Sequence, residues 1–94
     1  MNDMIKGLIE HARTYRGKGA IYLCRAEMCE PHSEEWKEYT YRAAKALFMA
    51  KQYYETAYHC AADIYGDDEA SEMLLDDIGN TCKMVDRMME EGED

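Results

Sequence analysis

The middle third of the chain carries one uninterrupted helical pattern. Between Pro31 and Gly66 there is neither glycine nor proline, and apolar or small residues recur at alternating intervals of four and three. These residues are Trp36, Thr40, Ala43, Leu47, Ala50, Tyr54, Ala57, Ala61 and Ile64. Such an alternation is the seam of a helix that packs lengthwise against other helices. The pattern therefore predicts a long helix over residues 33–65.

The first third of the chain repeats this alternation and contains glycines. The residues that follow it are Ile5, Leu8, Ala12, Tyr15, Gly19, Tyr22, Ala26 and Cys29. Gly17 and Gly19 each cost about 1 kcal/mol relative to alanine inside a helix. The spacing nevertheless continues in phase across them, which favours a single helix over residues 3–29. A break at Gly17–Gly19 would instead give a fold of four helices.

The last third predicts another helix, over residues 68–91, and short corners separate all the predicted helices. The seam of this last helix is Leu74, Ile78, Thr81, Val85 and Met88. Ser33 is a good N-cap for the middle helix, Gly66 suits the position after it, and Asp67 or Asp68 is expected to cap the last helix. Corners this short join antiparallel neighbours. The predicted fold is all-α, an antiparallel up-down-up three-helix bundle that forms a single domain over residues 1–94.

Composition narrows the class of protein. A chain of 94 residues makes one small domain, which hides only about two-thirds of its unfolded surface on folding. No stretch approaches the ~20 consecutive apolar residues of a membrane span. Charges are spread through the first residues, which therefore lack the apolar region of a signal peptide. These features predict a cytoplasmic protein without a membrane partner.

The cysteines are expected to be free thiols. They are Cys24, Cys29, Cys60 and Cys82. On an up-down-up layout they are spread along the bundle, whereas a disulfide needs Cα atoms within ~7 Å of each other. They fall on or beside the seams, so we expect them to pack as small apolar groups. Burial there would make the thiols inert. Free thiols are typical of a reducing compartment.

The negative charge of the chain is concentrated in its last third. The formal net charge is −9; residues 1–31 carry +1, residues 32–65 carry −1, and residues 66–94 carry −9. Phosphate would be repelled by that last segment. The charge pattern therefore argues against direct binding of nucleic acid.

The sequence offers little catalytic or metal-binding chemistry. Two sets of potential ligands are Glu55, His59 and Asp63 on one helix face, and Cys24, Cys29 and His32 near the first corner. The first set is typical of a solvated charged face. The second lacks the cysteine spacing and the fourth ligand of a zinc site. No cysteine is placed beside a histidine that could act as its base. We expect no catalytic residue, metal or cofactor, and a protein that is not an enzyme.

The acidic last helix is the first candidate binding surface. Its acids near the N-terminus are Asp67, Asp68, Glu69, Glu72, Asp76 and Asp77, which we expect to lie on the surface, and the first five are the candidate binding residues. Part of this charge suits the positive end of a helix, but further acids continue from Asp86 to Asp94, where the helix dipole disfavours them. Either solubility or a basic partner explains these acids, and both interpretations remain open.

An apolar line on the middle helix is the second candidate. Relative to the seam, the outermost residues are polar, whereas Tyr41, Phe48 and Met49 lie one step around the helix. Aromatic residues and methionine are enriched in protein interfaces, and contiguous apolar patches mark contact sites. The alternative is that the bundle buries a wide arc of this helix and covers all of them.

These features predict a small acidic protein-binding module that docks on a basic surface of a partner protein. In size and charge alone, the chain is similar to small acidic inhibitors, including some anti-CRISPR proteins and nucleic-acid mimics. Carboxylates along a rigid helix present negative charge much as a phosphate backbone does. The alternative is a homo-oligomeric helical bundle or adaptor that associates through Tyr41, Phe48 and Met49. An enzyme or metal protein ranks last.

Overall fold

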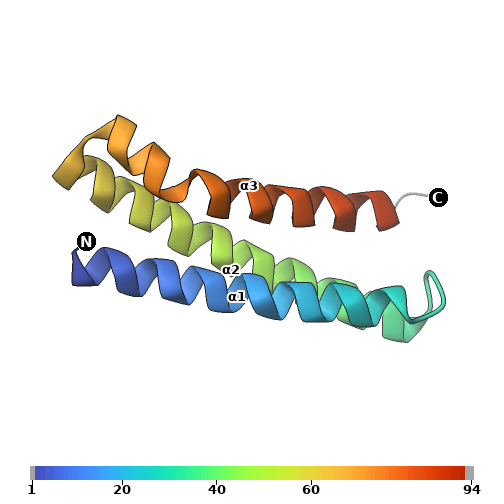
Figure 1. Ribbon diagram of the computed structural model, residues 1–94. Helices are drawn as coiled ribbons and strands as arrows, with labels where there is room; N and C mark the ends of the chain where they lie inside the picture. The colour runs from blue at the N-terminus through green and yellow to red at the C-terminus, as the bar shows by residue number, and fades with distance from the viewer. Residues whose placement is uncertain (1, 93–94) are drawn as a thin grey trace.

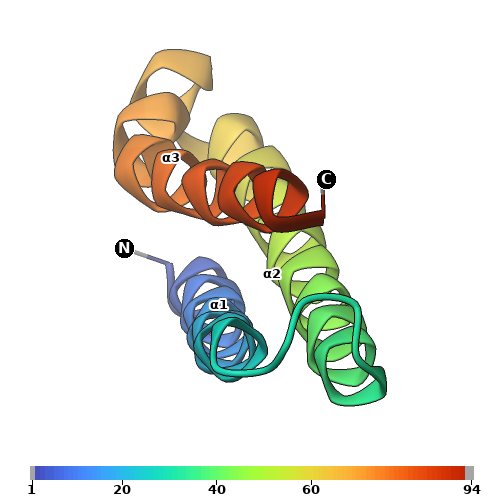
Figure 2. The same cartoon turned by 90° about the vertical axis from the view of Figure 1, so that its right-hand side faces the viewer.

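A computed structural model describes residues 2–92 and confirms an antiparallel three-helix bundle (Figure 1). Helix α1 spans Asp3–Glu27, α2 spans Glu34–Tyr65 and α3 spans Asp67–Gly92, and residues 2–92 contain no strand. The molecule is elongated, with principal extents of 47 × 21 × 14 Å. Helix α2 packs closely against both neighbours, whereas the backbones of α1 and α3 lie farther apart (Figure 2).

Helix α1 runs without a break through its glycines, so the alternative with four helices does not apply. Gly19 is fully buried against α2, where a Cβ atom would lie 2.7 Å from Leu47 Cδ2. Gly17 is exposed, and a Cβ atom there would meet nothing within 4 Å. Gly19 is therefore a point of close approach between α1 and α2, and its lower helix propensity is the cost of that approach.

The helix ends are fixed by local hydrogen bonds. Asn2 Oδ1 accepts from the backbone N–H groups of the first turn of α1, and Ser33 Oγ accepts from the Trp36 N–H at 3.2 Å. Gly66, with φ of 95°, is the single residue between α2 and α3, and its N–H donates to the Ala62 carbonyl at 2.9 Å. Because α3 already begins at Asp67, Gly66 occupies the position where we expected Asp67 or Asp68 as the cap.

The core is continuous along α2 and richest in small residues. The larger cluster joins all three helices and consists of Ile5, Ile9, Ala12, Ala50, Tyr54, Ala57, Ala61, Ala70 and Leu74. The smaller one consists of Leu23, Ala43 and Leu47, with Met84, Val85 and Met88 of α3 only partly buried against it. The C-terminal half of α3 therefore covers α2 less completely than its N-terminal half does.

The predicted seams are correct along most of their length and wrong at two isoleucines. Ile64 is 51% exposed, because it lies in the last turn of α2. Ile78 is 38% exposed, because Asp77 faces the interior in its place, next to the predicted seam residues Leu74 and Thr81. The rotation of α3 therefore differs only slightly from the predicted one.

The cysteines are free, but their predicted burial is wrong for half of them. Cys24 and Cys82 are exposed, and Cys29 and Cys60 are half-buried. Cys24 lies on the outer surface of α1, and Cys82 lies on the side of α3 that faces away from α1. Among the described helices, none is both long and apolar enough to span a bilayer.

Candidate protein-binding surface

A buried carboxylate determines how α3 sits on the other helices. Asp77 is only 8% exposed and accepts hydrogen bonds from Arg13 Nε at 3.1 Å, Arg13 Nη2 at 2.9 Å and Arg16 Nη1 at 3.0 Å. The Tyr54 hydroxyl donates to the same carboxylate at 3.3 Å. The hydrogen bonds from Arg13 hold the pKa of Asp77 below its ordinary value, and burial raises the pKa of Tyr54. One carboxylate thereby joins all three helices.

The sequence interpretation placed Asp77 among the surface acids. Its true position was visible in the spacing, because Ala70, Leu74, Asp77 and Thr81 recur at intervals of four, three and four, and all four are buried. Hydropathy alone does not identify a charged member of a seam. The partners that make its burial possible, Arg13 and Arg16, lie on another helix.

Turning Asp77 inward leaves a second apolar line on the outside of α3. We call this line the outer stripe; it consists of Leu75, Ile78, Cys82, Val85 and Met89. Leu75 is 68% exposed and Met89 is 62% exposed, and only Val85 is half-buried. The residues are spaced three and four apart, as in the seam that one helix presents to another. The sequence interpretation missed this line because it allowed α3 one seam only.

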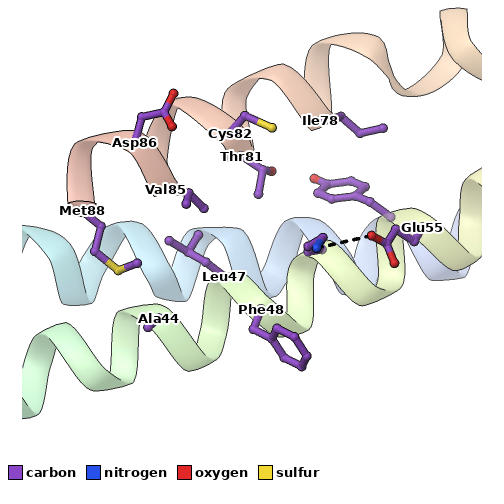
Figure 3. Close-up of a pocket in the computed structure, with 12 residues that line it drawn as sticks. Ala44, Leu47, Phe48, Glu55, Ile78, Thr81, Cys82, Val85, Asp86 and Met88 are labelled. Atoms are coloured by element: carbon purple, nitrogen blue, oxygen red, sulfur yellow. Dashed lines mark ion pairs between the residues drawn. The ribbon is translucent and has the colours of Figure 1, made fainter. Parts of the chain in front are cut away.

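The outer stripe borders an open groove between α2 and α3 (Figure 3). The groove has a volume of about 460 Å³, and its walls are mainly apolar. Leu47 and Val85 point toward one another between the two helices, and Phe48 stands on the α2 side. The remaining lining residues are Ala44, Lys51, Tyr54, Glu55, Ile78, Thr81, Cys82, Asp86 and Met88. The α2–α3 pair thus leaves apolar surface uncovered along its length.

The structure separates the three residues of the apolar line predicted on α2. Tyr41 is 65% exposed and Phe48 is 58% exposed, and Phe48 borders the groove with α3. Met49 is half-buried on the opposite side of α2, in a hollow that α2 shares with Tyr15 and Tyr22 of α1. Successive helix residues point about 100° apart, so Phe48 and Met49 face different neighbours.

The predicted partner-binding acids of α3, which do not include Asp77, are all exposed. Asp67, Asp68 and Glu69 form the first turn at the corner with α2, and Glu72 and Asp76 follow along the helix. Glu72 and Asp76 continue into a line beside the outer stripe, which we call the acidic edge: Glu72, Asp76, Asp86 and Glu90. Lys83 is the one basic residue in that line. Glu93 and Asp94 lie outside the described residues.

No member of the acidic edge makes an ion pair with another described residue. Asp86 is the member of this edge that lines the groove, so the α3 wall carries one negative charge that is not paired with any other described residue. On the α2 side the charges are mixed, because Lys51 Nζ lies 3.7 Å from Glu55 Oε1. A cationic ligand is favoured on the α3 side of the groove.

The candidate metal ligands are not gathered into a site. Within residues 2–92, no group of three or more histidine, cysteine, aspartate or glutamate side chains is placed to hold a metal ion. His32 lies against Trp36, with ring centroids 4.9 Å apart, rather than joining the cysteines in a cluster.

No family model, no curated protein and no solved structure matches this chain. The fold and the surface define an all-α bundle with an open, acid-bordered apolar groove between α2 and α3.

Proposed function

We propose that this chain is a non-enzymatic protein-binding module that docks α3 and the adjoining groove on a basic surface of a partner protein. The observation that carries the proposal is the exposed outer stripe of α3 beside an acidic edge that makes no ion pair with any other described residue. Apolar area supplies affinity, and uncompensated charge at its rim selects a partner of opposite sign.

The spacing of the acids supports an inhibitory role. From Asp67 to Asp76, five exposed acids follow one helix over about 14 Å. A row of carboxylates at this density presents negative charge as a phosphate backbone does. A basic surface that normally holds nucleic acid is the partner that this row suits, and the module would then compete with nucleic acid for that surface.

The test is capture of the partner with a matched pair of charge variants. The tagged chain is used to isolate bound proteins from its native host at low salt, and mass spectrometry identifies them. Neutralising part of the acidic edge with Asp76→Asn, Asp86→Asn and Glu90→Gln is expected to weaken binding about tenfold, because each rim charge contributes about 0.5 kcal/mol. Raising the salt concentration is expected to release the wild-type complex.

The control neutralises the same number of exposed acids away from this face, at Glu10, Glu30 and Asp63. It removes the same net charge and is expected to retain the partner. A partner with the same affinity for both variants, or with the same affinity at low and high salt, would contradict the proposal.

Self-association through α2 is the second candidate function. The exposure of Tyr41 and Phe48 favours it, because two large aromatic side chains a few turns apart are available to a second copy. Phe48→Glu is then expected to convert a dimer into a folded monomer in sedimentation experiments. A wild-type chain that stays monomeric at high concentration would exclude this candidate.

A further inference from the structure

The groove between α2 and α3 has the form of a vacant position in a four-helix bundle. We propose that it receives one amphipathic helix of a partner protein, with an apolar stripe toward the groove and basic residues toward α3. This inference rests on the proposed function and names the element of the partner that docks. The apolar spacing, the dimensions and the charge of the groove each support it.

Both walls present residues at the three- and four-residue intervals at which packed helices contact one another. On α3 the outer stripe recurs every three or four residues, and on α2 the residues Tyr41, Ala44 and Phe48 do the same. Two such lines frame holes into which the side chains of a further helix fit as knobs. From Leu75 to Met89 the stripe is about 21 Å long, so an occupant of roughly four turns covers it.

The floor of the groove needs an apolar side chain from the occupant. Leu47 is 1% exposed, but Val85 and Met88 beside it are only partly buried. The three helices cover the Val85 and Met88 side chains only in part, and a fourth helix would complete their burial.

Charge selects the class of helix. The wall formed by α3 is lined by one charged residue, Asp86, and the other residues of the acidic edge lie farther around the helix. The wall formed by α2 is bordered by the Lys51–Glu55 pair, which is neutral as a unit. A helix with lysine or arginine along one flank therefore matches the groove on both sides.

A second copy of this chain is a poor occupant. Its own outer stripe is bordered by the same acidic edge, so packing one stripe on the other would bring Asp76 and Asp86 near their counterparts. Like charges brought together across an interface oppose association. This charge argument favours a basic helix of a different protein.

The probe for the test is a synthetic peptide of about 18 residues, long enough for the stripe. It carries leucine at heptad a and d positions and lysine along the flanks, and its ends are blocked. One matched peptide has glutamate in place of lysine, and the other has the same composition in scrambled order. Cys82 reports occupancy because its exposed thiol lines the groove, and Cys24 is the internal control because its exposed thiol lies on α1.

Alkylation of each cysteine is followed by mass spectrometry. The basic peptide is expected to slow alkylation of Cys82 about tenfold at ten times its Kd, because protection follows the bound fraction. The rate at Cys24 is expected to stay unchanged. The acidic and scrambled peptides are expected to protect neither thiol. Protection of both cysteines, of neither, or by all three peptides would overturn the inference.

Ile78→Asp provides the second measurement. Ile78 is 38% exposed in the outer stripe, so the variant is expected to fold and to lose protection by the basic peptide. Its matched control is Ile21→Asp, at a residue of α1 that is 54% exposed, which is expected to bind as the wild type does. Thermal melts followed by circular dichroism verify folding of both. Binding that persists in Ile78→Asp places the peptide elsewhere and overturns the inference.

Two further outcomes separate this inference from the proposed function. If the captured partner is lost on neutralising the acidic edge but retained by Ile78→Asp, the module docks by charge alone, and only the helix-in-groove inference fails. If the wild-type chain dimerises and Ile78→Asp does not, the occupant is a second copy. Retention of the partner by the charge variant contradicts the proposed function itself, whatever the peptide does.

Discussion

The two interfaces of α2 are built from different side chains and close to different degrees. Toward α1, α2 presents Ala43, Ala50 and Ala57 at seven-residue intervals, all fully buried, and Gly19 lets the α1 backbone come close to Leu47. Toward α3, larger side chains such as Leu47 and Val85 leave a groove of about 460 Å³ between the helices. Small residues at seven-residue intervals allow a helix pair to pack closely. Large residues, on a helix whose buried ion pair joins it to α1, leave surface for another molecule.

The largest expected effect concerns the buried carboxylate that holds α3. Asp77→Ala removes the acceptor shared by Arg13, Arg16 and Tyr54. Its cost is expected to be about 2–3 kcal/mol in the free energy of unfolding, because the buried Tyr54 hydroxyl and the partly buried Arg16 guanidinium lose their acceptor. Urea unfolding measures this loss. Hydrogen exchange is expected to accelerate in α3 more than in α1, because the α1–α2 interface does not contain Asp77.

The neighbouring Asp76→Ala is the control for this change. Asp76 is exposed and makes no ion pair with another described residue, so its replacement is expected to alter the free energy of unfolding by less than about 0.5 kcal/mol. Equal effects at the two positions would contradict the role given to Asp77. They would also weaken the distinction between the buried position of Asp77 and the exposed position of Asp76.

The next effect concerns the sealed interface between α1 and α2. At Gly19 a new Cβ atom would lie 2.7 Å from Leu47 Cδ2, so Gly19→Ala forces a core side chain to move. Overpacking of this kind is expected to cost about 1–2 kcal/mol more than the gain in helix propensity returns. The matched Gly17→Ala meets no atom within 4 Å and is expected to stabilise the chain by about 0.5–1 kcal/mol. Thermal unfolding measures the Tm of each variant. A Tm above that of the wild type for both variants would show that α1 and α2 are not in tight contact.

The smallest expected effect is the pH dependence of the contribution that Asp77 makes to the free energy of unfolding. The pKa of Asp77 is lowered in the folded chain, so its contribution to stability is complete above the ordinary aspartate pKa of about 3.9. It is lost as the pH falls from there through the lowered pKa of the folded state. The difference in free energy of unfolding between wild type and Asp77→Asn is therefore expected to shrink under acid conditions. A difference that stays constant down to about pH 2 would contradict this assignment.

Much of the fold was predictable because the apolar spacing of α1 and α2 is regular. The interior positions of their seams, such as Ala12 and Ala50, are buried as expected, and the bounds of each helix differ from the prediction by at most two residues. The rotation of α3 was not predictable in the same way. Apolar residues recur on α3 in two phases, and Leu74 and Leu75 are neighbours in the sequence with opposite exposure.

The candidate site was predicted in part for the same reason. The exposure of Phe48 and of the candidate acids Asp67, Asp68, Glu69, Glu72 and Asp76 follows from single-helix geometry, whereas the expected exposure of Asp77 is wrong. The groove is a property of two helices together, and it depends on Asp77 being buried. That burial requires Arg13 and Arg16, which lie more than sixty residues away in the sequence. A pattern read along one helix contains no information about such partners.

The corner at Gly66 gives the groove a fixed width. With one residue between α2 and α3, α3 is joined to α2 at the corner; midway, Asp77 binds Tyr54 of α2 and Arg13 of α1, and farther along Arg87 of α3 pairs with Glu27 of α1. A surface held at three points along its length is preorganised. Most of the conformational entropy lost on docking is therefore lost by the partner. Making the partner more rigid, rather than this chain, is expected to raise the affinity of the complex.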